Sequence, residues 1–257
     1  MNDITIKRPI KWECSAQSHV GMVRDLNEDS VLSKQDSSLW IVADGMGGYE
    51  AGNIASKMVV NAMEDVGSFD TLDEFVTQVE DNLLDVNQRM LEYSEIMLDG
   101  RSMGSTAVTL MIQGQLGACL WVGDSRLYLF RNNTLSRLSQ DHSQVEEMIR
   151  QGLISDEEAL NHPESNVITR AIGVASEVCV DINLFKVQLG DIFLLCSDGL
   201  YNMVNADRII ERLQQGHIET AANDLIQDAL DNGARDNVSL ILVKGLPSKD
   251  LFSTAQE

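Results

Sequence analysis

The sequence is poor in basic residues and contains no long apolar run. It has 19 Lys and Arg against 40 Asp and Glu, which gives a formal net charge of −21. Binding of nucleic acid or of an anionic membrane surface needs the opposite charge balance, so both are disfavoured. No run of 18 apolar residues occurs, so we expect no membrane span. The polar segment Met1–Lys11 also lacks the apolar core of a secretion signal.

Cysteine is scarce and is not arranged for chemistry. The four cysteines are widely separated in the sequence: Cys14, Cys119, Cys179 and Cys196. They have no paired metal-ligand spacing. We interpret them as small apolar side chains of a protein in a reducing cytoplasm. Cysteine-dependent phosphatases carry arginine six positions after the nucleophile. The residues at that position here are Val20, Ser125, Phe185 and Asn202. The sequence therefore predicts a cytoplasmic protein that does not use a cysteine nucleophile.

Proline is rare as well, with 3 in 257 residues, and no Gly-, Ser- or Pro-rich linker divides the chain. Hydrophobic residues make up 44% of the sequence, enough for a sizeable core and too many for a disordered chain. We therefore expect a single domain over residues 1–257.

Short runs rich in β-branched, aromatic and other apolar residues, bounded by turn residues, predict strands. The predicted strands are Ser30–Leu32, Leu39–Ala43, Ser105–Ile112, Leu116–Val122, Leu127–Arg131, Val178–Gln188, Ile192–Ser197 and Val238–Val243. The pairs Gly114-Gln115 and Asn132-Asn133 are typical of hairpin turns, which favours antiparallel neighbours.

Apolar residues at helical spacing predict helices over Asn53–Val66, Thr71–Met97 and Glu219–Leu230. The first two stand as a block between strands and do not alternate strictly with them. This order indicates an α+β fold, in which two antiparallel sheets pack together and are flanked by helices. The polar segment 140–174 carries short helical patterns at Gln144–Gln151 and Asp156–Asn161. It is typical of a surface excursion, either a lid or a plain loop.

Four aspartates stand where an apolar strand meets a turn: Asp44, Asp124, Asp198 and Asp236. A single such aspartate is ordinary turn chemistry. Several on neighbouring strands would converge and repel one another unless a cation neutralises them. Carboxylate and carbonyl oxygens are the ligands of Mg²⁺ and Mn²⁺. A further acidic cluster, Asn27-Glu28-Asp29, precedes the first predicted strand. The pattern predicts a divalent-metal site.

Six motifs occur in order between about residue 17 and residue 243. They are Val20-Gly-Met-Val-Arg24-Asp-Leu-Asn-Glu28-Asp29, Ala43-Asp44-Gly45-Met46-Gly-Gly48, Gly104-Ser-Thr-Ala107, Val122-Gly-Asp124-Ser-Arg126, Ser197-Asp198-Gly199 and Arg235-Asp236-Asn237. Together they strongly resemble the metal-dependent protein Ser/Thr phosphatases of the PP2C (PPM) family, in its bacterial stand-alone form. The resemblance implies a four-layer α-β-β-α sandwich that hydrolyses phosphoserine and phosphothreonine on proteins and reverses partner kinases.

The resemblance also implies roles for individual residues. Two ions, Mn²⁺ or Mg²⁺, would be bridged by Asp44 and by a water that acts as the nucleophile. The remaining ligands it implies are the Gly45 carbonyl, Asp198 and Asp236 for the first ion, and Glu28 and Asp29 on the side of the second.

Other matched positions extend or depart from this set. Asp124, with Asp198, matches the pair that holds a third, weaker ion in bacterial members, and Arg24 matches the arginine that binds the substrate phosphate. Met46 stands where many eukaryotic members have a histidine proposed as the general acid, and methionine has no proton to donate. We therefore expect a water on the metal to be the acid, and we expect His142 and His162 to be structural.

Two alternatives remain open from the sequence. One is a metal-dependent phosphatase of a small-molecule phosphate, and the other is a non-catalytic regulatory member of the fold. The expected partners are phosphorylated proteins and a cognate Ser/Thr kinase, and the expected state is a monomer. Segment 140–174 falls where the family carries its flap beside the active site. Bacterial members serve several systems, among them type VI secretion control and growth signalling.

Overall fold

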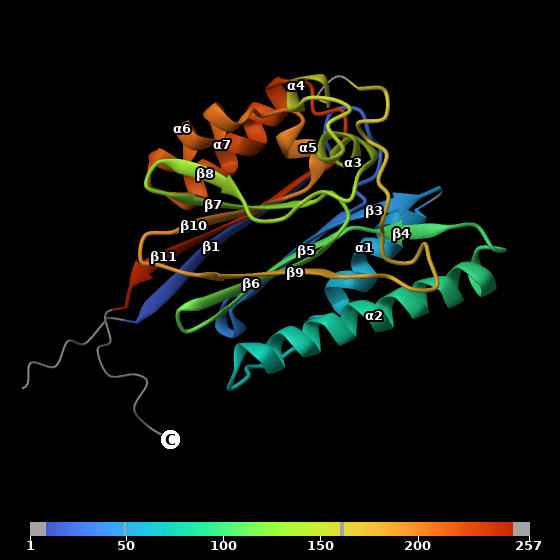
Figure 1. Ribbon diagram of the computed structural model, residues 1–257, viewed down its shortest axis with the longest axis horizontal. Coiled ribbons are helices and arrows are strands. Elements are labelled where there is room, and N and C mark those ends of the chain that lie inside the picture. The colour runs from blue at the N-terminus through green and yellow to red at the C-terminus, as the bar shows by residue number, and fades with distance from the viewer. Residues whose placement is uncertain (1–8, 49, 160–161, 249–257) are drawn as a thin grey trace, which may run out of the picture.

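Two antiparallel sheets packed face to face form the centre of the computed structural model, which describes residues 9–48, 50–159 and 162–248 (Figure 1). In spatial order, the first sheet contains β1 (Ile10–His19), β11 (Val238–Pro247), β10 (Ile192–Cys196), β7 (Arg126–Arg131) and β8 (Thr134–Arg137). The second contains β2 (Asp29–Lys34), β3 (Leu39–Gly47), β5 (Ala107–Gln113), β6 (Leu116–Val122) and β9 (Asp181–Lys186), with β4 (Met103–Ser105) paired to β3.

Helices cover the outer face of each sheet. The second sheet packs against α1 (Ala51–Asn61) and α2 (Leu72–Met97). The first sheet packs against α5 (Asp198–Tyr201), α6 (Ala206–Gln214) and α7 (Ile218–Asp231). A separate apolar cluster that includes Trp40, Leu195 and Ile241 fills the space between the sheets. The order of layers is therefore helix, sheet, sheet, helix, as the sequence predicted (Figure 1).

The central strands are buried on both faces, which explains why they were predicted from the sequence. All five residues of β10 are buried, and so are Leu39–Ala43 of β3. A strand that is covered on both sides needs a continuous apolar run rather than an alternating one. The predicted turns at 114–115 and 132–133 join β5 to β6 and β7 to β8. Asn132 and Asn133 both have positive φ, of 52° and 60°, as a tight hairpin turn requires.

The ends of several elements differ from the sequence prediction. The helix predicted to reach Val66 ends at Asn61, although Met63 and Val66 remain buried. Beyond Asn61 the backbone closes shorter hydrogen bonds, from Met63 N–H to the Val60 carbonyl and from Val66 N–H to the Met63 carbonyl. Turns thus continue the apolar spacing that suggested a helix. The predicted strand Ser105–Ile112 is interrupted at Thr106, and Val178–Gln188 shortens to β9.

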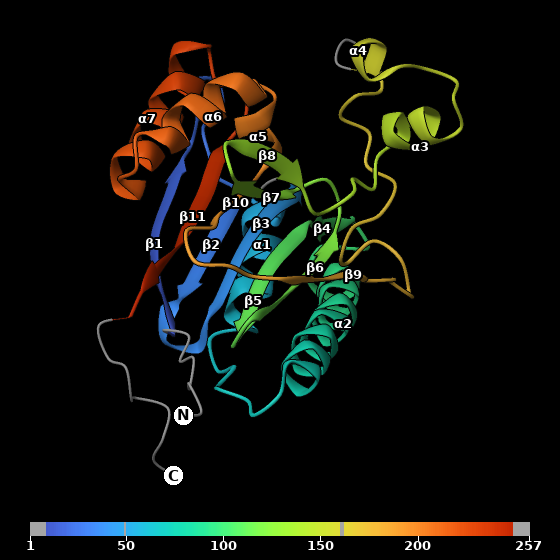
Figure 2. The ribbon, with the colours of Figure 1, turned by 60° about the vertical axis from the view of Figure 1, so that its left-hand side comes forward.

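The middle of segment 140–174 projects away from both sheets (Figure 2). It contains α3 (Gln144–Arg150) and α4 (Asp156–Ala159) and is joined to its surroundings by isolated bridges, such as Ser105 with Ile172. Residues 160–161 of the predicted helix Asp156–Asn161, and most of the segment Met1–Lys11, lie outside the described residues. None of the helices in the described ranges is long and apolar enough to cross a membrane.

Candidate metal and phosphate site

A cavity of about 310 Å³ opens where the two sheets meet the turn before β2 and the segment around Asn166. Nearly all of the predicted site residues line it: Arg24, Glu28, Asp44, Gly45, Asp124, Asp198 and Asp236. The remaining one, Asp29, pairs directly across the β2–β3 ladder with Asp44. The structure therefore brings together residues that lie up to 212 positions apart in the sequence, as between Arg24 and Asp236.

Two of these carboxylates keep an oxygen without a partner. Ser197 Oγ donates a hydrogen bond to Asp29 Oδ2 at 2.8 Å. The other oxygen, Asp29 Oδ1, is buried and has no hydrogen-bond partner in the described part of the chain, and the same is true of Asp198 Oδ1. A buried, unpaired carboxylate oxygen is costly. Hard divalent cations take such oxygens as ligands, so the donor set fits Mg²⁺ or Mn²⁺.

Burial and repulsion between neighbouring carboxylates both raise the pKa values of these groups. Burial, with the charges of Asp124 and Asp236 next, raises the pKa of Asp198 to about 8. Burial also raises the pKa of Asp29 and of Asp124 to about 6. The pKa of Asp44 lies well above its ordinary value because it is buried and faces Asp29 and Asp198. The protein alone therefore provides too little positive charge to keep every carboxylate of this cluster ionised at neutral pH.

Arg24 and Glu28 border the same cavity. Arg24 donates from Nη2 to Asp236 Oδ2 at 2.8 Å, and this hydrogen bond raises the pKa of the guanidinium. Burial raises the pKa of Glu28, against the opposing effects of Arg24 and of the backbone N–H groups of Gly52 and Asn53 at the start of α1. Arg24 thus occupies an oxygen of Asp236, which the sequence predicted to face an ion.

The carboxylates are neighbours, but they are not closed into a cage. Among the described residues, no group of three or more His, Cys, Asp or Glu side chains is placed so that it could hold an ion as it lies. The residue types and their unpaired oxygens fit a divalent cation, whereas the side-chain positions would have to tighten to bind one.

Glycine permits two close backbone approaches that assemble the cavity. A Cβ on Gly45 would lie 1.9 Å from the Gly52 carbonyl oxygen and 2.7 Å from that of Glu28. A Cβ on Gly199 would lie 1.9 Å from the Asn237 carbonyl oxygen. Only glycine fits at these positions, so the glycines that follow Asp44 and Asp198 allow the loops of the cavity to pack closely against one another.

Asn237 ties the acidic loop to the start of β11, a role that sequence reasoning missed. Its Oδ1 accepts from the Glu28 N–H at 2.8 Å. Its Nδ2 donates to the carbonyls of Val20 and Leu26 at 2.8 and 3.0 Å. The only signal in the sequence was its place in the motif after Asp236.

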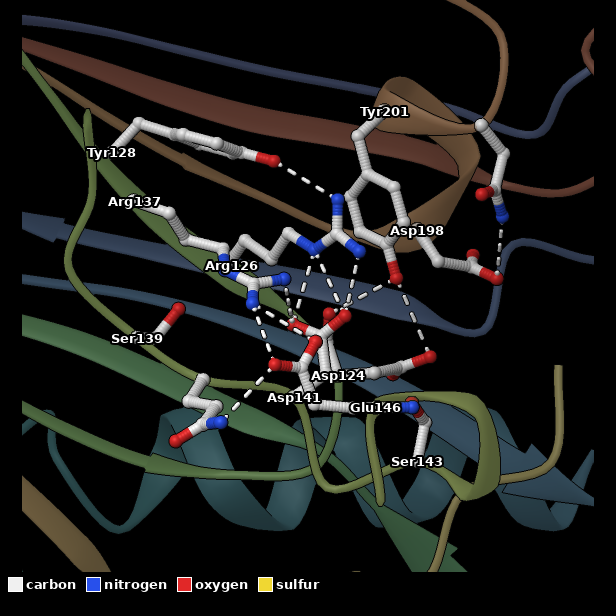
Figure 3. Close-up of polar contacts among 12 residues, drawn as sticks. Asp124, Arg126, Tyr128, Arg137, Ser139, Asp141, Ser143, Glu146, Asp198 and Tyr201 are labelled. Atoms are coloured by element: carbon white, nitrogen blue, oxygen red, sulfur yellow. Dashed lines mark hydrogen bonds and ion pairs between the residues drawn. The ribbon is translucent and has the colours of Figure 1, made fainter. Parts of the chain in front are cut away.

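A second group that sequence reasoning missed lies behind Asp124 (Figure 3). The Tyr201 hydroxyl donates to the Asp124 carbonyl at 3.1 Å and lies 3.4 Å from Asp124 Oδ2. The guanidinium of Arg126 stacks over the Tyr201 ring at 3.5 Å and also forms an ion pair with Asp141 at 2.6 Å. This stack fixes the loop that carries Asp124.

The two histidines considered as acids are engaged elsewhere. His142 Nδ1 accepts from the Gly123 N–H at 3.0 Å, and its ring stacks on Trp121. His162 Nδ1 accepts from the Glu164 N–H at 3.2 Å. Neither ring is among the described residues that line the cavity, whereas Met46 is.

Comparison with known proteins is consistent with this geometry. A sequence model of the family "Protein phosphatase 2C" matches residues 18–238. The chain is 39% identical over 233 residues to the serine/threonine phosphatase stp of Listeria monocytogenes serotype 4b, with 87% of this chain and 92% of the relative covered.

Two solved structures have a similar fold. PppA, described as a key regulatory component of T6SS in Pseudomonas aeruginosa, superposes with a TM-score of 0.86 at 35% identity over 93% of this chain and 100% of that one. The catalytic domain of the serine threonine protein phosphatase PstP, in complex with 2 manganese ions, superposes with a TM-score of 0.84 at 31% identity over 92% and 99%.

Proposed function

This chain belongs to the protein phosphatase 2C family, and we propose that it hydrolyses phosphoserine and phosphothreonine on proteins in the cavity lined by Asp44, Asp198 and Asp236. The observation that supports this most strongly is the convergence of buried, mutually repelling carboxylates, two of which keep an unpaired oxygen. Without a cation, such a cluster does not stabilise the fold. Its oxygens are, however, the ligands that an enzyme dependent on divalent cations needs.

The bound ions in PstP indicate manganese as the metal to test first. In this chain the residues that would hold two ions are Glu28, Asp29, Asp44, the Gly45 carbonyl, Asp198 and Asp236. Asp124 with Asp198 would hold a third. Ions held there supply Lewis acidity, which lowers the pKa of water and offsets the charge of the phosphoryl oxygens.

Other residues of the cavity would bind the phosphate and hold Asp44 in place. The planar guanidinium of Arg24 suits two phosphoryl oxygens, and its place beside Asp236 puts it at the mouth of the acidic cluster. The Asp44 N–H donates to Thr106 Oγ1 at 3.0 Å, and the Thr106 N–H donates to the Asp44 carbonyl at 2.8 Å, which fixes the backbone of Asp44. Met46 offers no proton, so water protonates the departing serine or threonine oxygen.

The partners follow from the reaction. A protein phosphatase reverses protein kinases, so its substrates are phosphoproteins and a cognate Ser/Thr kinase makes them.

The expected location is the cytoplasm, because the kinases that the enzyme would reverse need ATP. The four cysteines, all within the described residues, are unpaired, as in a reducing compartment. A net charge of −21 favours a monomer because like surfaces repel. PppA makes type VI secretion one pathway to examine.

The test compares an aryl phosphate with a phosphothreonine peptide, each with Mn²⁺ and then with excess chelator. We expect both to be hydrolysed with Mn²⁺ and neither with chelator. Absence of any metal-dependent turnover would contradict the enzyme and favour a regulatory member of the fold. Turnover of the aryl ester without the peptide would favour a small-molecule phosphatase.

A further inference from the structure

A second and larger cavity, of about 850 Å³, adjoins the catalytic cavity. It lies between β7, β8, α5 and the start of α6, and it is closed on one side by Ser165 and Asn166. Asn166, Asp198 and Asp236 line both cavities, so the two are continuous. A substrate whose phosphate lies beside Asp198 would therefore extend into this second cavity, which we call the side groove.

The walls of the side groove suit a polypeptide. Leu135 and Met203 provide apolar surface. Three exposed asparagines each use one half of the amide internally: Asn202 donates to Asp198, Asn205 accepts from the Arg208 N–H, and Asn232 donates to the Met203 carbonyl. The other half of each amide has no partner in the described part of the chain. Free carboxamide groups along a groove match the N–H and C=O groups of an extended main chain.

Arg235 is the cation that the described lining of the side groove leaves unpaired, and it lies in the same groove as Asp198 and Asp236. Arg126 is committed to Asp141, and Arg24 at the neighbouring cavity is committed to Asp236. Arg235 is exposed and forms no ion pair with any described residue. In a chain with 40 acidic residues against 19 basic ones, an uncommitted arginine beside the reaction centre favours a negatively charged ligand group.

We propose that the side groove binds the polypeptide that flanks the phosphorylated residue of the substrate, and that Arg235 selects an acidic side chain in that flank. The proposal rests on the proposed phosphatase function and adds a sequence preference to it. It predicts that the enzyme distinguishes phosphopeptides by a residue that takes no part in the chemistry.

The experiment measures kcat/KM for phosphothreonine peptides that differ only in carrying Glu or Lys within the four residues on either side of the phosphothreonine, with an aryl phosphate as a substrate too small to reach Arg235. The variants are Arg235→Glu and Arg235→Gln. The control is Lys11→Glu, which makes the same charge change at the end of β1 that pairs with Leu246, opposite to the end near the site.

We expect the wild type to prefer the Glu peptide on one side of the phosphothreonine and Arg235→Glu to prefer the Lys peptide. The Glu-to-Lys ratio should change by about tenfold, as expected for one exposed ion pair turned into a repulsion. Arg235→Gln should remove the preference without inverting it, and Lys11→Glu should leave the ratio unchanged.

Two outcomes would overturn the side-groove proposal. One is an unchanged ratio in both Arg235 variants, and the other is an equal loss on all substrates, which would mean damage to the adjacent Asp236. Wild-type enzyme that hydrolyses the aryl phosphate and no phosphopeptide would contradict the proposed protein-phosphatase function instead.

Discussion

Asp198 illustrates at the scale of one residue how a binding site opposes folding. Burial and the neighbouring charges of Asp124 and Asp236 raise its pKa to about 8, and its Oδ1 has no partner among the described residues. A carboxylate in this position costs free energy in the absence of a cation. The proposed metal site would account for a carboxylate here, since an uncharged residue of the same shape would fold at least as well.

Asp198→Asn therefore separates function from stability. We expect activity on a phosphopeptide to fall at least about 100-fold, because a charged metal ligand is lost. In chelator, the free energy of unfolding should stay within about 1 kcal/mol of wild type or rise. Chemical denaturation and a phosphate-release assay measure the two. The control is Asp25→Asn, the same change at an exposed carboxylate in the loop before β2. Comparable activity in Asp198→Asn would refute the assigned site.

Tyr201 is predicted to position Asp124 through its hydroxyl. Tyr201→Phe removes this donor and keeps the ring beneath Arg126, so unfolding should become easier by only about 1 kcal/mol. We expect the Mn²⁺ concentration for half-maximal activity to rise several-fold. Tyr128→Phe removes a hydroxyl that accepts from Arg126 without reaching Asp124, and it should leave the metal response unchanged. Equal metal responses in the two variants would contradict the positioning role.

At the scale of elements, the site depends on loops being held against strand ends. Asn237 satisfies the Glu28 N–H and the carbonyls of Val20 and Leu26, so it binds the loop before β2 to the start of β11. Three backbone groups lose their partner when this side chain is removed, and two of them belong to the loop that follows Gly21.

Asn237→Ala should therefore be more destabilising than an ordinary asparagine substitution. We expect a loss of about 2–4 kcal/mol in the free energy of unfolding, measured by urea denaturation. Asn183→Ala, which removes a single bond to the Leu138 carbonyl, is the matched control and should cost about 1 kcal/mol. If the two variants lose the same stability, Asn237 does not hold the loop as described.

The same scale shows what the sequence could and could not predict. Strands covered on both faces, such as β3 and β10, carry continuous apolar runs and were predicted. The edge strand β1 was missed, because its side chains alternate and most of them reach solvent. Helix α6 was missed as well, because it has only 9 residues, although its buried Ile209 and Leu213 have helical spacing. An element this short gives few repeats of its pattern, whatever the contrast between its two faces.

The site was predictable for a different reason. The aspartates at strand ends stand in local motifs, so the sequence displays them directly. The hydrogen bonds of Asn237 to Glu28 and of Tyr201 to Asp124 join residues 209 and 77 positions apart. The local sequence around each residue does not indicate which distant residue it will contact. A site residue can therefore be recognised from a short motif, whereas the contacts that hold it in place depend on the tertiary fold.

At the scale of the whole molecule, charge couples stability to metal and pH. The unfolded chain ionises its aspartates near pH 4, whereas folding raises the pKa of Asp198 to about 8 and that of Asp29 and Asp124 to about 6. Between these values the folded state binds more protons than the unfolded state. In chelator, these groups should therefore make the protein less stable as pH rises from about 4 to about 8.

Mn²⁺ should reverse this trend, because it binds the ionised carboxylates. At one fixed Mn²⁺ concentration, about 100 times the Kd at pH 8, we expect Tm to rise by about 5–10 °C at pH 8 and by less than half of that at pH 5, where protonation weakens binding. Thermal unfolding at both pH values, with Mn²⁺ and with chelator, gives the four melting temperatures required. An equal shift at pH 5 and pH 8 would mean that the raised pKa values do not belong to the metal site.

The central claim is that the buried carboxylates bind divalent ions, and anomalous scattering from a crystal grown with Mn²⁺ tests it most directly. We predict two strong manganese peaks in the cavity, with Asp44 in contact with both and with Asp198 and Asp236 on one of them. A map with no manganese peak within coordination distance of Asp44 would contradict the account.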